Sequence, residues 1–150
     1  MDMPTLEEAQ AQLNYEVAVY KEQLSMLKRE TERIGLTSID LTNALRTVEN
    51  LGTERVLMPI GGGAMIKGNV SETKVLMPIG AEYLLEMEKD KAVDELNRRI
   101  DATKKAAEKL TEEFGKIMTK LQEVSGQLQQ IETQAHISER GEETMKEDYL

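Results

Sequence analysis

The chain has 150 residues, of which 28 are acidic and 19 are basic, and its net charge is −9. This acidic balance argues against binding to the nucleic-acid backbone, which requires clustered Lys and Arg, and the absence of cysteine excludes disulfides and Cys-ligated zinc. Four tyrosines and one phenylalanine are too few aromatic residues for a large compact core, which favours an elongated helical protein.

The N-terminal segment, residues 5–49, carries a heptad repeat in which the inward positions step alternately by three and four residues. Thr5 and Glu8 form a capping-box pattern directly after Pro4, which predicts that a helix begins at Thr5. At about 1.5 Å per residue this helix is roughly 70 Å long. It is therefore expected to form an arm rather than one element of a compact core.

The middle segment, residues 54–88, contains the hexapeptide Val-Leu-Met-Pro-Ile-Gly twice, at 56–61 and at 75–80. In each copy an apolar strand ends at glycine and is followed by a second apolar stretch, which predicts two β-hairpins. Pro59 and Pro78 lack the N–H that a central strand donates, so we expect them at strand ends, edges or bulges.

Both faces of these predicted strands carry apolar side chains. Isolated hairpins are only marginally stable in water, so we expect the strands to complete a sheet or barrel with strands from other subunits. The residues expected at this oligomer interface are Val56, Leu57, Met58, Ile60, Met65, Ile66, Val75, Leu76, Met77, Ile79, Leu84 and Leu85.

A second heptad segment covers residues 90–138, and residues 139–150 are expected to be a flexible acidic tail because no residues remain to face them. If the two helices fold back on each other with Val48 meeting Val93, Leu27 faces Phe114. The predicted fold is α+β and mostly α, in a single domain. It consists of a long antiparallel intrachain coiled coil with two β-hairpins between the helices, whose strands complete an oligomeric β-barrel.

No residue pattern points to catalysis, a cofactor or a metal, so we do not expect an enzyme. The glycine-rich stretch 61–68 contains no Gly-Lys-Ser/Thr, which favours a structural turn over a phosphate loop. His136 is the only histidine, so one chain cannot assemble a zinc pair or a Ser-His-Asp triad. The longest charge-free stretch, residues 56–66, is far shorter than the roughly 20 residues that span a bilayer. With no signal-peptide pattern at the acidic N-terminus, we expect a cytoplasmic protein without a membrane or nucleic-acid partner.

With long heptad helices on either side of two linked hairpins, the chain resembles the prefoldin alpha subunit of the archaeal type. The strand Val-Leu-Met-Pro-Ile-Gly-Gly-Gly-Ala-Met-Ile-Lys-Gly at 56–68 is similar to that family's first hairpin, and two hairpins rather than one point to the alpha class. The resemblance implies a heterohexamer of two alpha and four beta subunits, with a double β-barrel platform and six coiled-coil arms. It also implies an ATP-independent holdase co-chaperone that binds unfolded polypeptides at the arm tips and delivers them to a group II chaperonin.

The net charge is concentrated at the two ends of the chain. Residues 1–20 carry four acidic residues and no basic one, residues 121–150 carry seven acidic and two basic ones, and residues 21–120 balance at 17 of each. In an antiparallel pair both ends lie together at the tip of the arm. Two interpretations remain open: solubility of an exposed tip, and attraction of basic clients or of a basic patch on the chaperonin.

Client binding is expected at this tip, where the predicted layers become poor and Leu6 faces only Ala135. The incompletely covered apolar residues there are Met3, Leu6, Ile131 and Ile137. Exposed apolar side chains that can repack suit promiscuous recognition of unfolded chains. The alternative function is a structural coiled-coil scaffold or tether that binds no client. The duplicated hairpins favour the chaperone, because a simple tether needs only a short loop between its helices.

Overall fold

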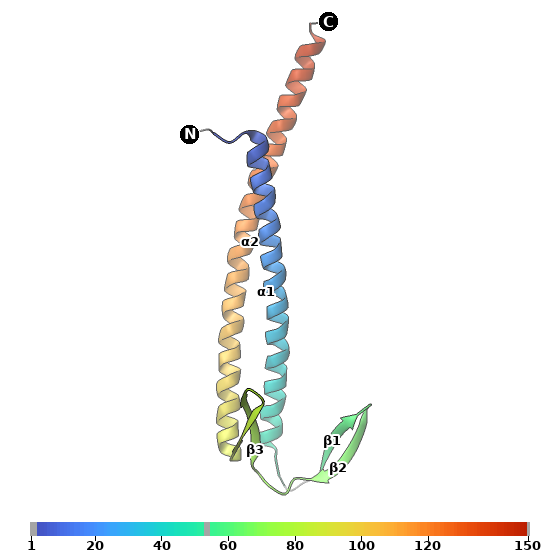
Figure 1. The fold of residues 1–150 in the computed structure, drawn as a ribbon, viewed down its shortest axis with the longest axis vertical. Helices are drawn as coiled ribbons and strands as arrows, with labels where there is room; N and C mark the ends of the chain where they lie inside the picture. The colour runs from blue at the N-terminus through green and yellow to red at the C-terminus, as the bar shows by residue number, and fades with distance from the viewer. Residues whose placement is uncertain (1–2, 53–54, 150) are drawn as a thin grey trace. The chain divides into compact units, whose positions relative to one another are not determined.

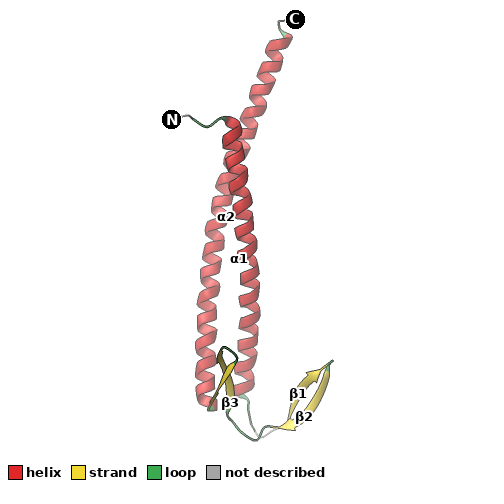
Figure 2. Ribbon diagram, in the orientation of Figure 1, coloured by secondary structure: helices red, strands yellow, loops and turns green. Residues whose placement is uncertain are grey.

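The computed structural model describes residues 3–52 and 55–149, so the predicted start of the hairpin segment at residue 54 lies outside the described residues. Along the chain, a long helix is followed by four strands and then by a second long helix (Figures 1 and 2). The elements are α1 (Leu6–Glu49), β1 (Arg55–Gly61), β2 (Ala64–Asn69), β3 (Val75–Gly80), β4 (Tyr83–Met87) and α2 (Lys89–Glu147). Among the described helices, none combines the length and the apolar character needed to cross a membrane.

The chain divides into two compact units, which are described separately. The terminal unit comprises residues 1–32 and 108–150, and the hairpin unit comprises residues 33–107. Each unit holds part of α1 and part of α2. The two helices form the antiparallel intrachain coiled coil that the heptad repeats predict (Figure 1).

The start of α1 confirms the predicted capping box. The backbone N–H of Thr5 donates to Glu8 Oε2 over 2.9 Å, and the N–H of Glu8 donates to Thr5 Oγ1 over 3.2 Å. Two N–H groups that the first turn leaves without helical partners are thereby satisfied. At the other end, the side-chain amide of Asn50 donates to the carbonyl oxygen of Arg46 over 2.7 Å.

In the terminal unit the half-buried residues follow the predicted heptads. Val124 is the most deeply covered apolar residue of this part, with 7% of its surface exposed. Leu27 lines a groove together with Glu113 and Ile117, the residues on either side of the turn that carries Phe114. Leu27 and Phe114, which the predicted register pairs, are both half-buried.

The hairpin unit contains the main apolar core. Its buried members are Val48 of α1, Met77 of β3, and Ala92 and Leu96 of α2. Seven partly buried residues pack against them, namely Leu41, Ala44, Leu45, Leu51, Val75, Met87 and Val93. The β3–β4 hairpin is therefore held by the helix pair of its own chain.

Each hairpin is a two-stranded antiparallel sheet, β1 with β2 and β3 with β4. The register of the first shifts between Pro59 and Gly61, and that of the second shifts between Pro78 and Gly80. Each proline therefore lies next to a bulge, which confirms the prediction that both lie at strand ends, edges or bulges. Proline is tolerated there because the ladder is interrupted and needs no N–H donor.

The two hairpin turns differ in their strain. Both central residues of each turn have positive φ, as a type I′ turn requires. The first turn uses Gly62 (58°) and Gly63 (79°), whereas the second places Ala81 (48°) and Glu82 (64°) in this region. Left-handed backbone costs a residue with a β-carbon roughly 1–2 kcal/mol. The second turn is therefore the strained one.

We expect Glu82→Gly to raise the free energy of unfolding of the chain by about 1 kcal/mol, because glycine adopts positive φ without a steric penalty. Urea unfolding followed by circular dichroism measures the change. Gly63→Ala, at the equivalent position of the first turn, is the matched control and should destabilise its hairpin by a similar amount. A neutral or destabilising effect of Glu82→Gly would contradict the assignment of strain.

The C-terminal boundary of the second helix was predicted wrongly. We expected the helix to end at residue 138 and a flexible tail to follow, but α2 continues to Glu147. The reason is that helical hydrogen bonds are local, so each added residue gains one bond without needing a facing helix. Thr144 supports these turns by donating its hydroxyl to the carbonyl oxygen of Arg140 over 2.7 Å.

Candidate functional site

The faces of the two hairpins are the first candidate surface, and strand register assigns residues to them, since directly opposed residues share a face. We call one face of each hairpin the methionine face and the other the leucine face. The methionine faces comprise Val56, Met58, Ile66 and Gly68 in the first hairpin, and Val75, Met77, Leu85 and Met87 in the second. The leucine faces comprise Leu57, Pro59, Met65 and Lys67 in the first hairpin, and Leu76, Pro78, Leu84 and Glu86 in the second.

Most of the methionine face of the second hairpin packs on the helices of its own chain, whereas Leu85 on the same face is 50% exposed. Met77 is only 4% exposed and contacts the core formed by the two helices, and Val75 is packed against the same core. Both residues were expected at the oligomer interface. Their side chains are instead covered within the subunit, because α1 and α2 provide the apolar surface that they need.

The methionine face of the first hairpin is more open. Met58, the counterpart of Met77, is 44% exposed, and Ile66 opposite it is 51% exposed. The side chain of Met58 lies over Gly68, where an added β-carbon would come within 2.5 Å of the Met58 methyl group. Glycine at residue 68 therefore makes room for this methionine.

The leucine faces of both hairpins are uncovered. Leu57, Leu76 and Leu84 are each exposed by more than half, and so are the bulge residues Ile60 and Ile79. Tyr83 at the start of β4 is equally exposed and was missed in the sequence analysis, although an aromatic residue beside a hairpin turn is a visible signal. Exposed apolar side chains on a two-stranded sheet are typical of surfaces that bind a protein partner.

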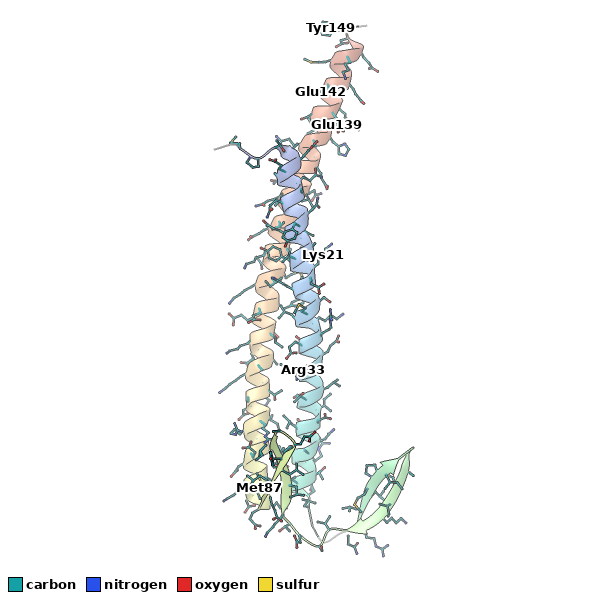
Figure 3. The ribbon with its side chains drawn as sticks, viewed as in Figure 1. Lys21, Arg33, Met87, Glu139, Glu142 and Tyr149 are labelled. Carbon is teal, nitrogen blue, oxygen red and sulfur yellow. The ribbon has the colours of Figure 1, made fainter. Side chains whose placement is uncertain are left out.

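The tip residues form the second candidate surface, and all four predicted ones belong to the terminal unit. Met3, Leu6 and Ile137 are exposed, whereas Ile131 is half-buried. The sequence analysis missed Tyr15 and Met26, which are also exposed on α1 in this unit. Both residues lie at outward positions between the heptad residues, and this position in the sequence indicates that they are exposed. Figure 3 shows acidic side chains such as Glu139 and Glu142 projecting from the last turns of α2.

An ionic cluster joins α2 to the second hairpin. The Glu95 carboxylate accepts from Arg98 over 2.6 Å and from Arg99 over 2.8 Å. Arg99 also donates to the carbonyl oxygen of Pro78 in β3 over 2.7 Å. The hydrogen bonds from Arg98 and then Arg99 lower the pKa of the Glu95 carboxyl from 4.5 to about 2. Glu95 therefore stays ionised and orients the arginine that holds β3.

This low pKa predicts acid sensitivity. A carboxyl whose pKa is lowered on folding stabilises the fold above its unfolded value of 4.5, and the stabilisation is lost as pH falls through the folded value of about 2. As the pH falls from 4.5 to about 2, the free energy of unfolding of the wild-type chain should decrease more than that of the Glu95→Gln variant. Urea unfolding at several pH values measures the difference. Glu108→Gln, an exposed position on the same helix, is the control, and equal acid sensitivity of Glu95→Gln and wild type would contradict the role of Glu95.

Within the part of the chain that the structure describes, no group of three or more His, Cys, Asp or Glu side chains could hold a metal ion. The described residues present two groups of exposed apolar side chains, one on the hairpins and one at the free ends of the helices.

Comparisons with known proteins agree with this architecture. The family model described as "Prefoldin subunit" matches residues 20–134. The chain is 34% identical over 121 residues to prefoldin subunit alpha of Methanococcus aeolicus, covering 77% of this chain and 83% of the relative. It is 30% identical over 125 residues to prefoldin subunit alpha of Pyrococcus horikoshii, covering 75% and 84%.

Two solved structures share the fold. The first is the cryo-EM structure of filamentous PFD from Methanocaldococcus jannaschii, with a TM-score of 0.64, 23% identity and coverage of 76% of this chain and 98% of that chain. The second is the crystal structure of the prefoldin beta subunit from Thermococcus strain KS-1, with a TM-score of 0.59, 20% identity and coverage of 85% and 96%. The chain therefore belongs to the prefoldin subunit family, and the two relatives from Methanococcus aeolicus and Pyrococcus horikoshii are alpha subunits.

Proposed function

We propose that this chain is a subunit of an ATP-independent holdase co-chaperone that binds unfolded polypeptides in the cytoplasm and delivers them to a group II chaperonin. The observation that carries the proposal is the pair of hairpins with uncovered leucine faces between two paired helices. In a chain of the prefoldin family, these faces fit a subunit that assembles with others and presents its helices as an arm.

For assembly, we propose a hexamer of two such chains with four beta-class prefoldin subunits. The leucine faces and the open methionine face of the first hairpin supply the contacts, because they carry apolar surface that the chain itself does not cover. Burying such surface is favourable by about 25 cal/mol per Å². The strands are expected to complete a β-barrel with strands of the neighbouring subunits.

For client binding, we propose the exposed apolar residues Met3, Leu6 and Ile137, together with the half-buried Ile131. Methionine suits this role because its unbranched, polarizable side chain adapts to different partners. The surrounding acidic residues favour basic client segments or a basic patch on the chaperonin, with an attraction that salt weakens. A client-free scaffold would have no use for exposed apolar residues at its ends.

The experiment compares aggregation of a guanidine-unfolded test protein in the presence of wild-type and variant hexamers. Met3→Ser, Leu6→Ser and Ile137→Ser combined should leave the hexamer mass unchanged and abolish protection of the client. The matched control is Leu36→Ser with Ile39→Ser, which alters exposed apolar residues of α1 in the hairpin unit. Full protection by the tip variant would place the client site elsewhere, and a wild-type hexamer without protection would favour the scaffold.

A further inference from the structure

Glutamine has an uneven distribution in this chain. All eight glutamines lie within residues 10–23 and 122–134, which belong to the terminal unit. They are Gln10, Gln12, Gln23, Gln122, Gln127, Gln129, Gln130 and Gln134, and we call these residues the glutamine band. The hairpin unit contains none.

Two stretches within the glutamine band are poor in charge, whereas Lys21 and Glu22 lie beside Gln23 and Glu132 lies close to Gln134. Glu16 is the only charged residue among residues 9–20, and Glu123 is the only one among residues 121–131. Glutamine has about the same helix propensity as Glu and Lys, so helix formation does not explain the preference. Solubility does not explain it either, because charged side chains keep a surface soluble more effectively. The side-chain amides therefore call for another explanation.

Most of these amides are free. Gln12 donates to Glu16 Oε1 over 3.3 Å, and the other seven glutamine side chains have no hydrogen-bond partner among the described residues. Nearby hydroxyl groups are occupied within the helix, since Thr133 donates to the carbonyl oxygen of Gln129 over 2.8 Å. The band thus presents donors and acceptors that the fold does not use.

The C-terminal part of the band lines a groove on α2. Its lining residues are Gly126, Gln129, Gln130, Thr133, Gln134 and Ile137. Gly126 leaves open space, because a β-carbon there would have no atom within 4 Å. A neighbouring groove shares Gln129 and Thr133 and adds Gln10 of α1, and it is also lined by Glu132, His136 and Glu139. The two grooves thereby bring amides of both helices onto one surface.

We infer that the glutamine band binds the main chain of extended, non-native polypeptides, an inference that rests on the proposed function. An unfolded chain carries one unpaired N–H and one C=O at nearly every residue, and a glutamine amide can donate to one and accept from the other. The groove on α2 has no charged lining residue, which matches a ligand that is dipolar but uncharged. Gly126 admits close approach of the backbone, and Ile137 contacts apolar client side chains.

The test uses a fluorescent uncharged peptide and the same peptide with alternate main-chain nitrogens methylated, which removes donors while keeping the side chains. Binding is measured by fluorescence anisotropy with the full-length chain assembled with beta-class subunits. The wild-type assembly should bind the methylated peptide about tenfold more weakly, because two or more main-chain hydrogen bonds are lost. Gln129→Ala, Gln130→Ala and Gln134→Ala combined should weaken binding of the unmethylated peptide to a similar extent and remove the difference between the peptides.

The matched control is Glu108→Ala, Lys109→Ala and Glu113→Ala, which reproduces the spacing on an exposed face of the same helix. It should preserve both affinities. Equal wild-type binding of the two peptides, or unchanged binding by the glutamine variant, would overturn the inference while leaving the proposed function intact. Altered assembly by the glutamine variant would show that the band contacts another subunit and would also overturn it. No binding of either peptide by wild type would mean that the proposed function itself fails.

Discussion

Met77→Ala is expected to lower the free energy of unfolding of the isolated chain by about 2–5 kcal/mol, the range for truncating a buried methionine. Met77 is 4% exposed and joins β3 to the core of Val48, Ala92 and Leu96, so its loss leaves a cavity between the hairpin and both helices. Urea unfolding followed by circular dichroism measures the change.

The duplicated hexapeptide provides an unusually close control for this substitution. Met58 occupies the same position of the same sequence in the first hairpin, yet it is 44% exposed. Met58→Ala should therefore cost the isolated chain less than about 1 kcal/mol. Similar losses for the two variants would show that the first hairpin is as firmly packed as the second.

Replacing residues 54–88 by a short Gly/Ser linker is expected to abolish the hexamer while most of the helical content remains. The linker removes the strands whose leucine faces are not covered by any of the described residues. Native mass spectrometry after mixing with beta-class subunits measures assembly, and far-ultraviolet circular dichroism measures helicity.

A milder variant separates loss of the interface from loss of the Met77 core. Leu57→Lys with Leu76→Lys changes only the leucine faces and should also prevent assembly, because a charge would be buried without a partner. Leu36→Lys with Ile39→Lys alters exposed α1 residues outside the hairpins and should leave assembly unchanged. Recovery of an intact hexamer from the leucine-face variant would refute the proposed interface.

The helices and hairpins were predictable because each leaves a periodic or local signal. Heptad spacing determines which residues face inward, the Thr5 and Glu8 capping box marks a helix start, and a proline two residues before a glycine marks a bulge. The end of α2 was not predictable by the same reasoning. A missing partner removes tertiary contacts, but it leaves the hydrogen bonds within the helix intact.

The candidate surfaces were predictable only in part. Met58 and Met77 lie in identical hexapeptides, so local sequence cannot reveal that only the second docks on the helices of its own chain. That difference depends on long-range packing against Val48 and Leu96. The glutamine band, in contrast, is visible in the sequence. Heptad spacing does not reveal it, because that spacing follows inward apolar positions and all of these glutamines except Gln10 are exposed.

The extension of α2 has a consequence for the dynamics of the terminal unit. Ala135 is the last half-buried residue of the helix, and residues 136–149 are exposed. A free helix of about 12 residues is marginal in water, so these turns open by local unfolding at little free-energy cost, independently of the rest. We expect amide hydrogens there to exchange with solvent faster than those near Leu96. The C-terminal turns of α2 are therefore expected to unfold progressively on warming. The acidic tip then changes gradually from an ordered helix to a mobile chain.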